Sequence, residues 1–405
     1  MQNSGIALGQ SHVEFKVGWH NAWMTHTNAS IATHFGELVD PRRDRGKNHV
    51  LMEIIIMAVV AVIGGANDWV HVALFCRAKE AWLRSVLQLT LPHGVPSHDT
   101  FGRVFSVLAP ETFQRCFVNW VRAMVELQGG EVVSLDGKAV RRSHDHHDGK
   151  AAVMMVNAWA SEAGLALGLR DVPEDTNEIT VVPELLQQLV LTGCIVTMDA
   201  AHCQTENARI VVEQGGDYVL ALKANQGRLH AEVARAFEAE QRRDFHEVRH
   251  ETLDTREKNH GRIETRRHTL LTDAHYLDYF NREGQWAGLA GVGRIERTRE
   301  LDGRVEHETH YYITSLKGEV KRFAHAARSH WHVENKLHWV LDVVFREDDS
   351  RARLGRVSEN FALLRQMALN LLTREDTPKL SLTSKRLQAG WDNDFLLKVV
   401  SGGVP

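Results

Sequence analysis

Hydrophobic positions along the chain change their spacing twice, and the first region has a helical spacing. From Phe35 to Gln128 apolar residues recur every three or four positions, which predicts an all-helical N-terminal region over 35–128. The apolar run from Ile54 to Ala66 is shorter than the roughly 20 residues that cross a bilayer, so it predicts a buried helix. Residues 1–34 show no clear period, and we expect a poorly structured leader there.

After Gly129-Gly130 the pattern changes to short apolar strands. Strands are predicted over 131–137, 151–160 and 164–172, followed by a helix over 179–190. A strand over 194–200, a helix over 205–216 and a strand over 217–223 come next. Three consecutive strands followed by strand–helix alternation predict one mixed α/β sheet with helices on both faces.

The third region, about 240–315, alternates polar and apolar residues and predicts a β-rich insertion that is separate from the core sheet. Its hairpins are expected to turn at Asn259-His260-Gly261 and at Asp302-Gly303. A long helix carrying Glu334 and a helix starting at Ser358 follow. The catalytic domain is therefore expected over 129–375, with a C-terminal tail over 376–405.

Composition narrows the class of protein without naming it. The chain is 43% hydrophobic and 25% charged, with a net charge of -4, which indicates a soluble globular protein in which DNA binding would need local basic patches. Four scattered Cys without a CxxC pair argue against a zinc ribbon or a disulfide framework and favour the cytoplasm. Acids dilute every basic cluster, so each is expected to be mixed surface: Arg42-Arg43-Asp44-Arg45, Arg141-Arg142, Arg242-Arg243 and Arg266-Arg267.

Three acids are the candidates for chemistry. Asp136 and Asp199 each end a predicted apolar strand, and functional groups gather at that edge of an open α/β sheet. Glu334, on a helix that can cross the edge, would complete the set. Neighbouring carboxylates repel, and a divalent cation relieves the repulsion. All-oxygen ligands favour Mg²⁺ or Mn²⁺, so we expect two such ions bound by Asp136, Asp199 and Glu334, which would promote phosphoryl displacement.

Four stretches carry a resemblance to a known family: SLDGKAVRRS, TMDAAHCQ, YVLALKANQGRL and HWHVENKLHWVLDVVFREDDSRARLG. Together they resemble the H-repeat-associated, ISAs-type transposases of bacterial insertion sequences, a DDE family with an RNase H-like core. DPRRDRGKNHVLMEIIIMAVVAVIGGANDW resembles the helical domain that precedes this core. The resemblance implies an RNase H-like fold and a catalytic triad of Asp136, Asp199 and Glu334.

Related transposases carry a Tyr-Arg-Glu-Lys signature on the helix of the catalytic Glu. In this chain the Tyr, Arg and Lys positions of that signature are Ala327, His330 and Leu341. The phosphate contacts of that signature are therefore not transferred. The residues expected to contact DNA are Lys138, Arg141, Lys223, Asn225, Arg328, His330, Trp331 and Lys336. Trp339 is expected in the core, and His144, His146 and His147 in a solvated loop.

The resemblance implies a bacterial DNA transposase that cleaves phosphodiesters at the element ends and transfers the 3′-OH into target DNA. Its partners would be the terminal inverted repeats and the target DNA, with a homodimer on paired ends and no membrane. The alternatives are a plain RNase H-like nuclease and a catalytically idle, transposase-derived DNA-binding protein. A zinc hydrolase using His330, Glu334 and His338 lacks HExxH spacing and ranks last.

Overall fold

The computed structural model describes residues 30–44, 47–144, 152–173, 175–259, 262–301, 304–351 and 354–402. Several predicted features lie outside these residues: the leader up to residue 29, Arg45, His146, His147 and the turn residues 260–261 and 302–303. The end of the expected leader is helical, because α2 (Ile31–Phe35) overlaps it. No helix among the described residues is long and apolar enough to cross a bilayer.

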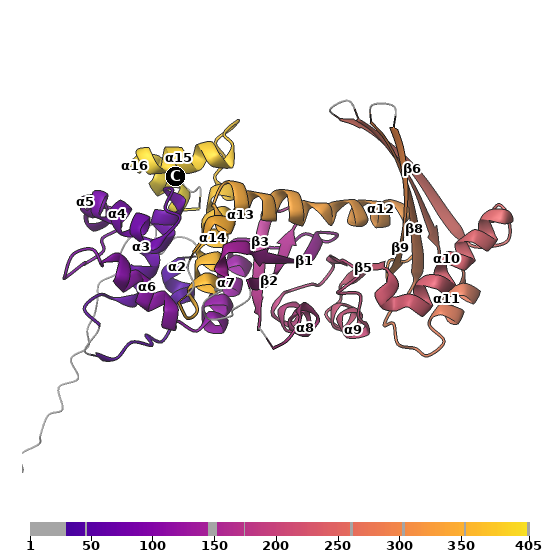
Figure 1. The fold of residues 1–405 in the computed structure, drawn as a ribbon, viewed down its shortest axis with the longest axis horizontal. Coiled ribbons are helices and arrows are strands. Elements are labelled where there is room, and N and C mark those ends of the chain that lie inside the picture. The colour runs from indigo at the N-terminus through magenta and orange to yellow at the C-terminus, as the bar shows by residue number, and fades with distance from the viewer. Residues whose placement is uncertain are drawn as a thin grey trace, which may run out of the picture.

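The N-terminal region is helical, as its periodicity predicted. After α2 its helices are α3 (Leu51–Ile63), α4 (Trp69–Ala78), α5 (Glu80–Ser85), α6 (His98–Val107) and α7 (Pro110–Met124). The predicted apolar helix is α3, in which every residue from Ile54 to Ile63 is buried. The stretch expected as a C-terminal tail forms α15 (Leu382–Trp391) and α16 (Asn393–Val400), which pack beside α3 (Figure 1).

A single nine-stranded sheet follows, in the order β3-β2-β1-β4-β5-β9-β8-β7-β6. The strands are β1 (Val132–Val140), β2 (Val153–Ala160), β3 (Leu165–Val172), β4 (Ile195–Met198), β5 (Asp217–Leu222), β6 (His250–Asn259), β7 (Arg262–Leu271), β8 (Gly291–Leu301) and β9 (Arg304–Thr314). The first three strands are antiparallel, and β1, β4 and β5 are parallel. This first half of the sheet has the mixed RNase H-like arrangement that the sequence predicted.

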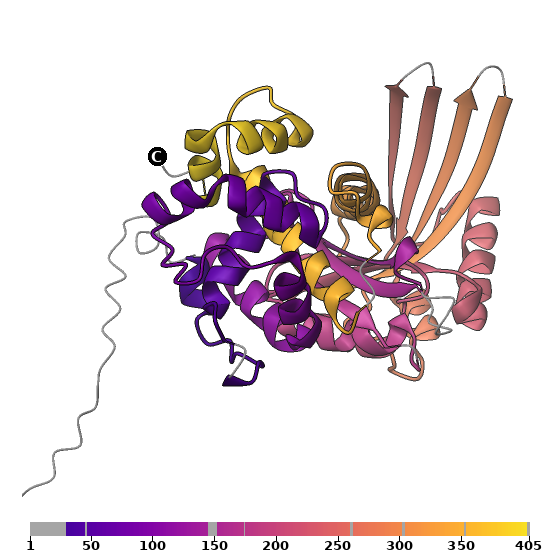
Figure 2. The same cartoon turned by 60° about the vertical axis from the view of Figure 1, so that its left-hand side comes forward.

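The predicted β insertion exists, but the expectation that it is separate from the core sheet is wrong. The two hairpins, β6–β7 and β8–β9, join the core because β9 pairs with β5 from Val219↔Thr314 to Leu222↔Tyr311. Only one end of β9 makes this contact, and the four strands then project well beyond the core (Figure 2). The two hairpins therefore extend the sheet beyond the core.

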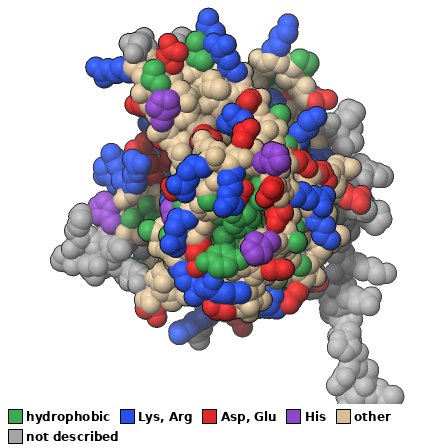
Figure 3. All heavy atoms as spheres, turned by 90° about the vertical axis from the view of Figure 1, so that its right-hand side faces the viewer, with side chains coloured by type: hydrophobic (Ala, Val, Ile, Leu, Met, Phe, Trp, Pro, Cys, Tyr) green, Lys and Arg blue, Asp and Glu red, His purple; other side chains and the backbone are tan. Residues whose placement is uncertain are grey.

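Helices cover both faces of the sheet (Figure 1). One layer contains α8 (Glu178–Gln188) and α9 (Thr205–Glu213), and the other contains α12 (Val320–Ser329), the π-helical segment η4 (Val333–His338) and α13 (Trp339–Val343). Near the projecting strands lie α10 (Gly227–Arg242) and α11 (Ala274–Phe280). The outer side of the hairpins, together with α10 and α11, carries interspersed basic and acidic side chains (Figure 3).

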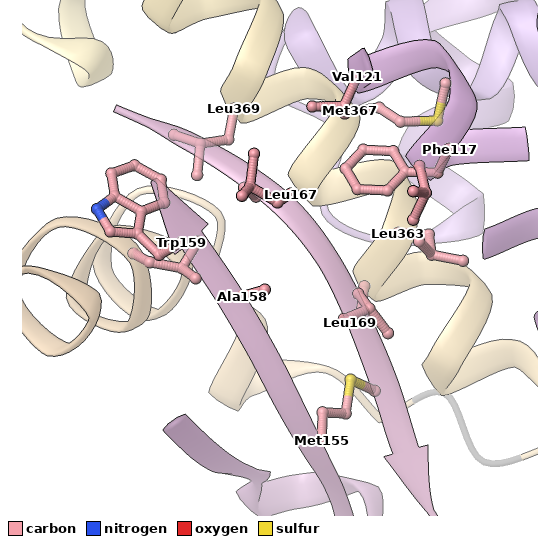
Figure 4. Close-up of a cluster of buried hydrophobic side chains, with 14 of the residues drawn as sticks. Phe117, Val121, Met155, Ala158, Trp159, Leu167, Leu169, Leu363, Met367 and Leu369 are labelled. Atoms are coloured by element: carbon pink, nitrogen blue, oxygen red, sulfur yellow. The ribbon is translucent and has the colours of Figure 1, made fainter. Parts of the chain in front are cut away.

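The helical region is joined to the sheet by α14 (Val357–Arg374), which is buried along almost its whole length rather than on one side. Its apolar residues meet α7, β2 and β3 in one cluster, shown with Phe117, Trp159, Leu167 and Met367 (Figure 4). Burial of this much apolar surface is the main stabilising contribution to folding. The helical region and the sheet therefore share one core.

Glycine at position 293 lets α12 lie close against β8. A Cβ atom added at Gly293 would lie 2.2 Å from the ring of Phe323. We expect Gly293→Ala to destabilise the protein by about 1–3 kcal/mol, because the ring must shift out of a packed site. Urea unfolding would measure the change, with Gly129→Ala as the control because nothing lies within 4 Å of that position. Equal stability of the two variants would contradict this packing argument.

Candidate active site

Asp136 and Asp199 lie at the same edge of the central parallel strands. The parallel ladder of β1 and β4 ends at the pair Leu135↔Met198, and these two acids are the next residues. The expectation that Asp136 ends its strand is wrong, because β1 continues to Val140 and Asp136 pairs with Asn157 of β2. The end that matters chemically is the end of the parallel pairing, where β4 stops.

Glu334 approaches this edge from the helical layer above the sheet. It lies in η4, where the Trp339 N–H donates to the Glu334 carbonyl five residues earlier. Such π turns are rare and occur often at functional sites. Asp136, Asp199 and Glu334 line one pocket of about 530 Å³. The structure thus brings together the three acids that the sequence singled out.

The acids influence one another electrostatically. Burial, followed by the charges of Asp199 and Glu334, raises the pKa of Asp136 from 3.8 to about 7. Partial burial also raises the pKa of Glu334. Within the described part of the chain, no three His, Cys, Asp or Glu side chains already stand as a set that could hold a metal ion. The three carboxylates nevertheless fit a hard divalent cation, because all their donor atoms are oxygens and their mutual repulsion favours a positive charge between them.

We expect Asp136→Asn to stabilise the metal-free protein at pH 8. An acid with a raised pKa holds a proton in the folded state that the unfolded chain has lost, so stability falls as pH rises from 3.8 to about 7. The shift corresponds to at most about 4 kcal/mol, and solvent screening reduces the expected gain to roughly 1–3 kcal/mol. Thermal unfolding in EDTA at pH 8 and pH 4 would measure it. A gain of equal size at both pH values would contradict the electrostatic origin.

Polar contacts hold the Asp199 loop in place. Asp199 accepts a hydrogen bond from the His202 backbone N–H at 3.2 Å, and the buried His202 ring lies 3.4 Å from Glu178. The Asn225 side chain donates to the carbonyl of Ala200. Asn225, expected to contact DNA, therefore ties the end of β5 to the loop after β4.

The two His that a zinc site would need are engaged with protein groups. His330 lies 3.1 Å from the hydroxyl of Thr197, and His338 lies 3.6 Å from Asp136. Burial is the main cause that lowers the pKa of each imidazole to about 4, so both rings are neutral near pH 7. The geometry gives His330 and His338 supporting contacts and does not favour a zinc hydrolase.

Four of the residues expected to contact DNA line the acid pocket: Lys223, Arg328, His330 and Trp331. Lys223 follows β5, and Arg328 forms an ion pair with Glu257 at 3.1 Å. Trp331 is 46% exposed, so its ring is available to a ligand in the pocket. His330 is partly buried, and because its pKa is lowered to about 4 its ring carries no charge near pH 7.

The remaining expected contacts lie elsewhere. Lys138 is buried and forms ion pairs with Asp342 at 2.7 Å and Glu347 at 2.8 Å, so it does not reach a DNA surface. Arg141 is exposed and lies 3.4 Å from Asp348. Lys336 is exposed on η4, outside the pocket lining.

Trp339 and Arg266 lie in environments that differ from those expected from the sequence. Trp339 is 56% exposed rather than in the core, because the buried residues Val333, Leu337, Val340 and Leu341 follow one side of the helix and Trp339 lies off that side. Arg266 is not mixed surface, since it is 8% exposed and lines the acid pocket. The sequence patterns did not point to the other pocket residues from the β insertion: Arg262, Glu264, His268, Arg297, Arg299, His310 and Tyr312. The alternation of Arg262, Glu264 and Arg266 was the signal that could have found this face.

The sheet order, with helices on both faces, defines an RNase H-like α/β fold. Family models agree: the DDE_Tnp_1-associated model matches residues 32–121, and the model described as Transposase DDE domain matches residues 127–371. The chain therefore belongs to the DDE transposase family.

Curated relatives cover most of the chain. The chain is 35% identical over 376 residues to the "H repeat-associated putative transposase YhhI" of Escherichia coli K12, covering 92% of this chain and 98% of the relative. It is 43% identical over 286 residues to an uncharacterized protein in the dhlA 3′ region of Xanthobacter autotrophicus, covering 69% of this chain and 93% of the relative. Among solved structures, the piggyBac transposase in a synaptic complex with hairpin DNA matches with 8% identity and a TM-score of 0.40, covering 94% of this chain and 76% of that chain. That similarity is too distant to bear on function.

Proposed function

We propose that the protein is an active transposase that cleaves DNA phosphodiesters at the ends of its element and transfers the freed 3′-OH into target DNA. The observation that supports this most strongly is the shared pocket of Asp136, Asp199 and Glu334. Burial, and after it the charges of Asp199 and Glu334, raise the pKa of Asp136, which supports the proposal. Family membership provides the substrate class, which is DNA.

In this proposal Asp136 and Asp199 present carboxylate oxygens from the sheet edge, and Glu334 presents one from the opposite helix. These residues would hold Mg²⁺ or Mn²⁺, with two ions as in the expected mechanism. When bound, such ions activate water and stabilise the charge that develops on the phosphate. Asp136 gives up its proton when a cation binds, because the positive charge offsets the repulsion from the other two acids.

We infer that DNA enters along the open side of the pocket. Lys223 and Arg328 would contact phosphates there, and the exposed Trp331 ring would pack against the nucleic acid. Exposed Lys336 and Arg141 would add phosphate contacts outside the pocket lining. Pairing of two element ends favours a homodimer, which remains part of the proposal.

A cleavage assay on a duplex carrying the element's own terminal repeat, with Mg²⁺ or EDTA, tests the proposal. A transposase nicks the repeat boundary only with the metal, and joins a pre-cut 3′-OH end to a second duplex. Cleavage without joining would favour the plain nuclease. Specific binding without either reaction would favour the idle DNA-binding protein and contradict the proposal.

A further inference from the structure

The β insertion presents a row of guanidinium groups to the acid pocket. Side chains alternate between the two faces of a strand, so Arg262, Glu264 and Arg266 of β7 share one face. The register of β7 with β8 places Arg297 beside Arg266 and Arg299 beside Glu264 on that face. All five residues line the pocket that also contains Asp136, Asp199 and Glu334. The pocket therefore has an acidic side, formed by Asp136, Asp199 and Glu334, and a basic side, formed by Arg262, Arg266, Arg297 and Arg299. We call this second side the basic wall.

One buried carboxylate holds the basic wall together. Like charges opposite each other on adjacent strands repel, as Arg266 and Arg297 would. Glu264 relieves this repulsion: it lies 3.4 Å from Arg262 and 3.7 Å from Arg297, and it forms a close hydrogen bond with Arg266. Glu264 is only 4% exposed, whereas Arg262 and Arg299 keep 39% and 34% of their side chains exposed. Three more acids pair with these arginines: Glu257 with Arg266 at 3.3 Å, Glu308 with Arg297 at 2.7 Å and Glu306 with Arg299 at 3.6 Å. None of the three lines the pocket, so on the β-insertion side of the pocket lining four arginines stand against the single acid Glu264.

We propose that this wall binds the phosphodiester backbone of the substrate DNA next to the acids, and that Glu264 occupies the place of a phosphate until DNA binds. The inference rests on the proposed function for its choice of DNA as the ligand. Guanidinium groups bind carboxylates and phosphates with the same forked geometry, so a phosphate can replace Glu264 between Arg262, Arg266 and Arg297. Glu264 keeps the arginines arranged in the free protein and competes with DNA for them.

A DNA-binding assay tests the inference. It uses a short duplex of scrambled sequence and measures binding by fluorescence anisotropy in EDTA over a series of salt concentrations. Each lost phosphate contact reduces the slope of log K against log salt by about 0.9, so Arg262→Gln/Arg299→Gln should lower the slope by up to about 1.8 and weaken binding roughly tenfold. Glu264→Gln should bind several-fold more tightly, because the competing charge is gone. EDTA and a scrambled duplex keep cleavage and end recognition out of the measurement.

The opposite face of the same strands provides matched controls. Arg267 of β7 and Asp254 of β6 form a pair at 3.9 Å, are both more than half exposed, and do not line the pocket. Arg267→Gln should therefore leave the slope unchanged, and Asp254→Asn should leave the affinity unchanged. If these variants shift binding as much as the pocket variants do, DNA senses only the overall charge and the inference is overturned.

Two results would overturn the inference separately. An unchanged slope in Arg262→Gln/Arg299→Gln would show that the wall does not contact DNA. Binding by a normally folded Glu264→Gln that is no tighter than the parent would show that Glu264 does not compete. If Glu264→Gln melts at a lower temperature, the exposed Arg262 and Arg299 variants decide the question. Failure of the proposed function would instead appear as absence of Mg²⁺-dependent cleavage, with the salt slopes unaffected.

Discussion

Glu334→Gln will reduce Mg²⁺-dependent cleavage of element-end DNA by roughly 10³-fold or more, while DNA affinity changes little. Glutamine keeps the shape of the side chain but removes the charge that a cation requires. Asp136→Asn and Asp199→Asn should have the same effect, because all three acids line one pocket. Residues that act as a unit do not lose activity additively, so a double variant should be no worse than a single one.

A matched control is Glu319→Gln at the start of α12, which is exposed, pairs with Arg322 at 3.3 Å and lies outside the pocket lining. It should cleave like the parent protein. Single-turnover rates with saturating enzyme would separate the cleavage step from DNA binding. Cleavage that survives in all three acid variants would disprove their catalytic role.

Lys138→Met should destabilise the fold by about 3–5 kcal/mol, because it leaves buried carboxylates without their partner. Lys138 lies 2.7 Å from Asp342 and 2.8 Å from Glu347, and Arg365 lies 3.6 Å from the same Glu347. Although burial alone would lower it, the charges of Glu347 and Asp342 raise the pKa of Lys138. This cluster ties β1, two residues after Asp136, to the segment that follows the Glu334 helix.

Urea unfolding would measure the free energy of unfolding of Lys138→Met. Lys336→Met is the matched control, since Lys336 is exposed on η4. The Lys336 variant should be nearly as stable as the parent. If Lys138→Met is equally stable but binds DNA weakly, then Lys138 reaches DNA as the sequence suggested and the buried cluster is not structural.

Local patterns predicted the core well. Helical spacing identified the buried helix α3, and apolar runs located β1 to β5 in order, because these segments bury their side chains against their own neighbours. Asp136 and Asp199 followed from the same runs, since the sheet edge lies where a run stops, whereas Glu334 was chosen because its helix can cross that edge. The chain also carries extended motifs of its family in these segments.

Features that depend on distant residues were not predicted. The pairing of β9 with β5 is a contact between strands far apart in sequence, and alternation within the hairpins contains no information about it. The burial of Arg266 follows from ion pairs with Glu264 and Glu257. The expectation for Trp339 failed for a local reason: the general tendency of Trp to be buried was preferred over the helical spacing, which places Trp339 away from the buried Val333, Leu337 and Leu341.

Binding of Mn²⁺ to the protein–DNA complex, followed by the EPR signal of free Mn²⁺, tests most directly whether Asp136, Asp199 and Glu334 form one metal-dependent site. The parent complex should bind Mn²⁺ beyond what the DNA alone binds. The triple variant Asp136→Asn/Asp199→Asn/Glu334→Gln should lose this excess while still binding the duplex. Equal Mn²⁺ binding by the parent and the triple variant would contradict the account.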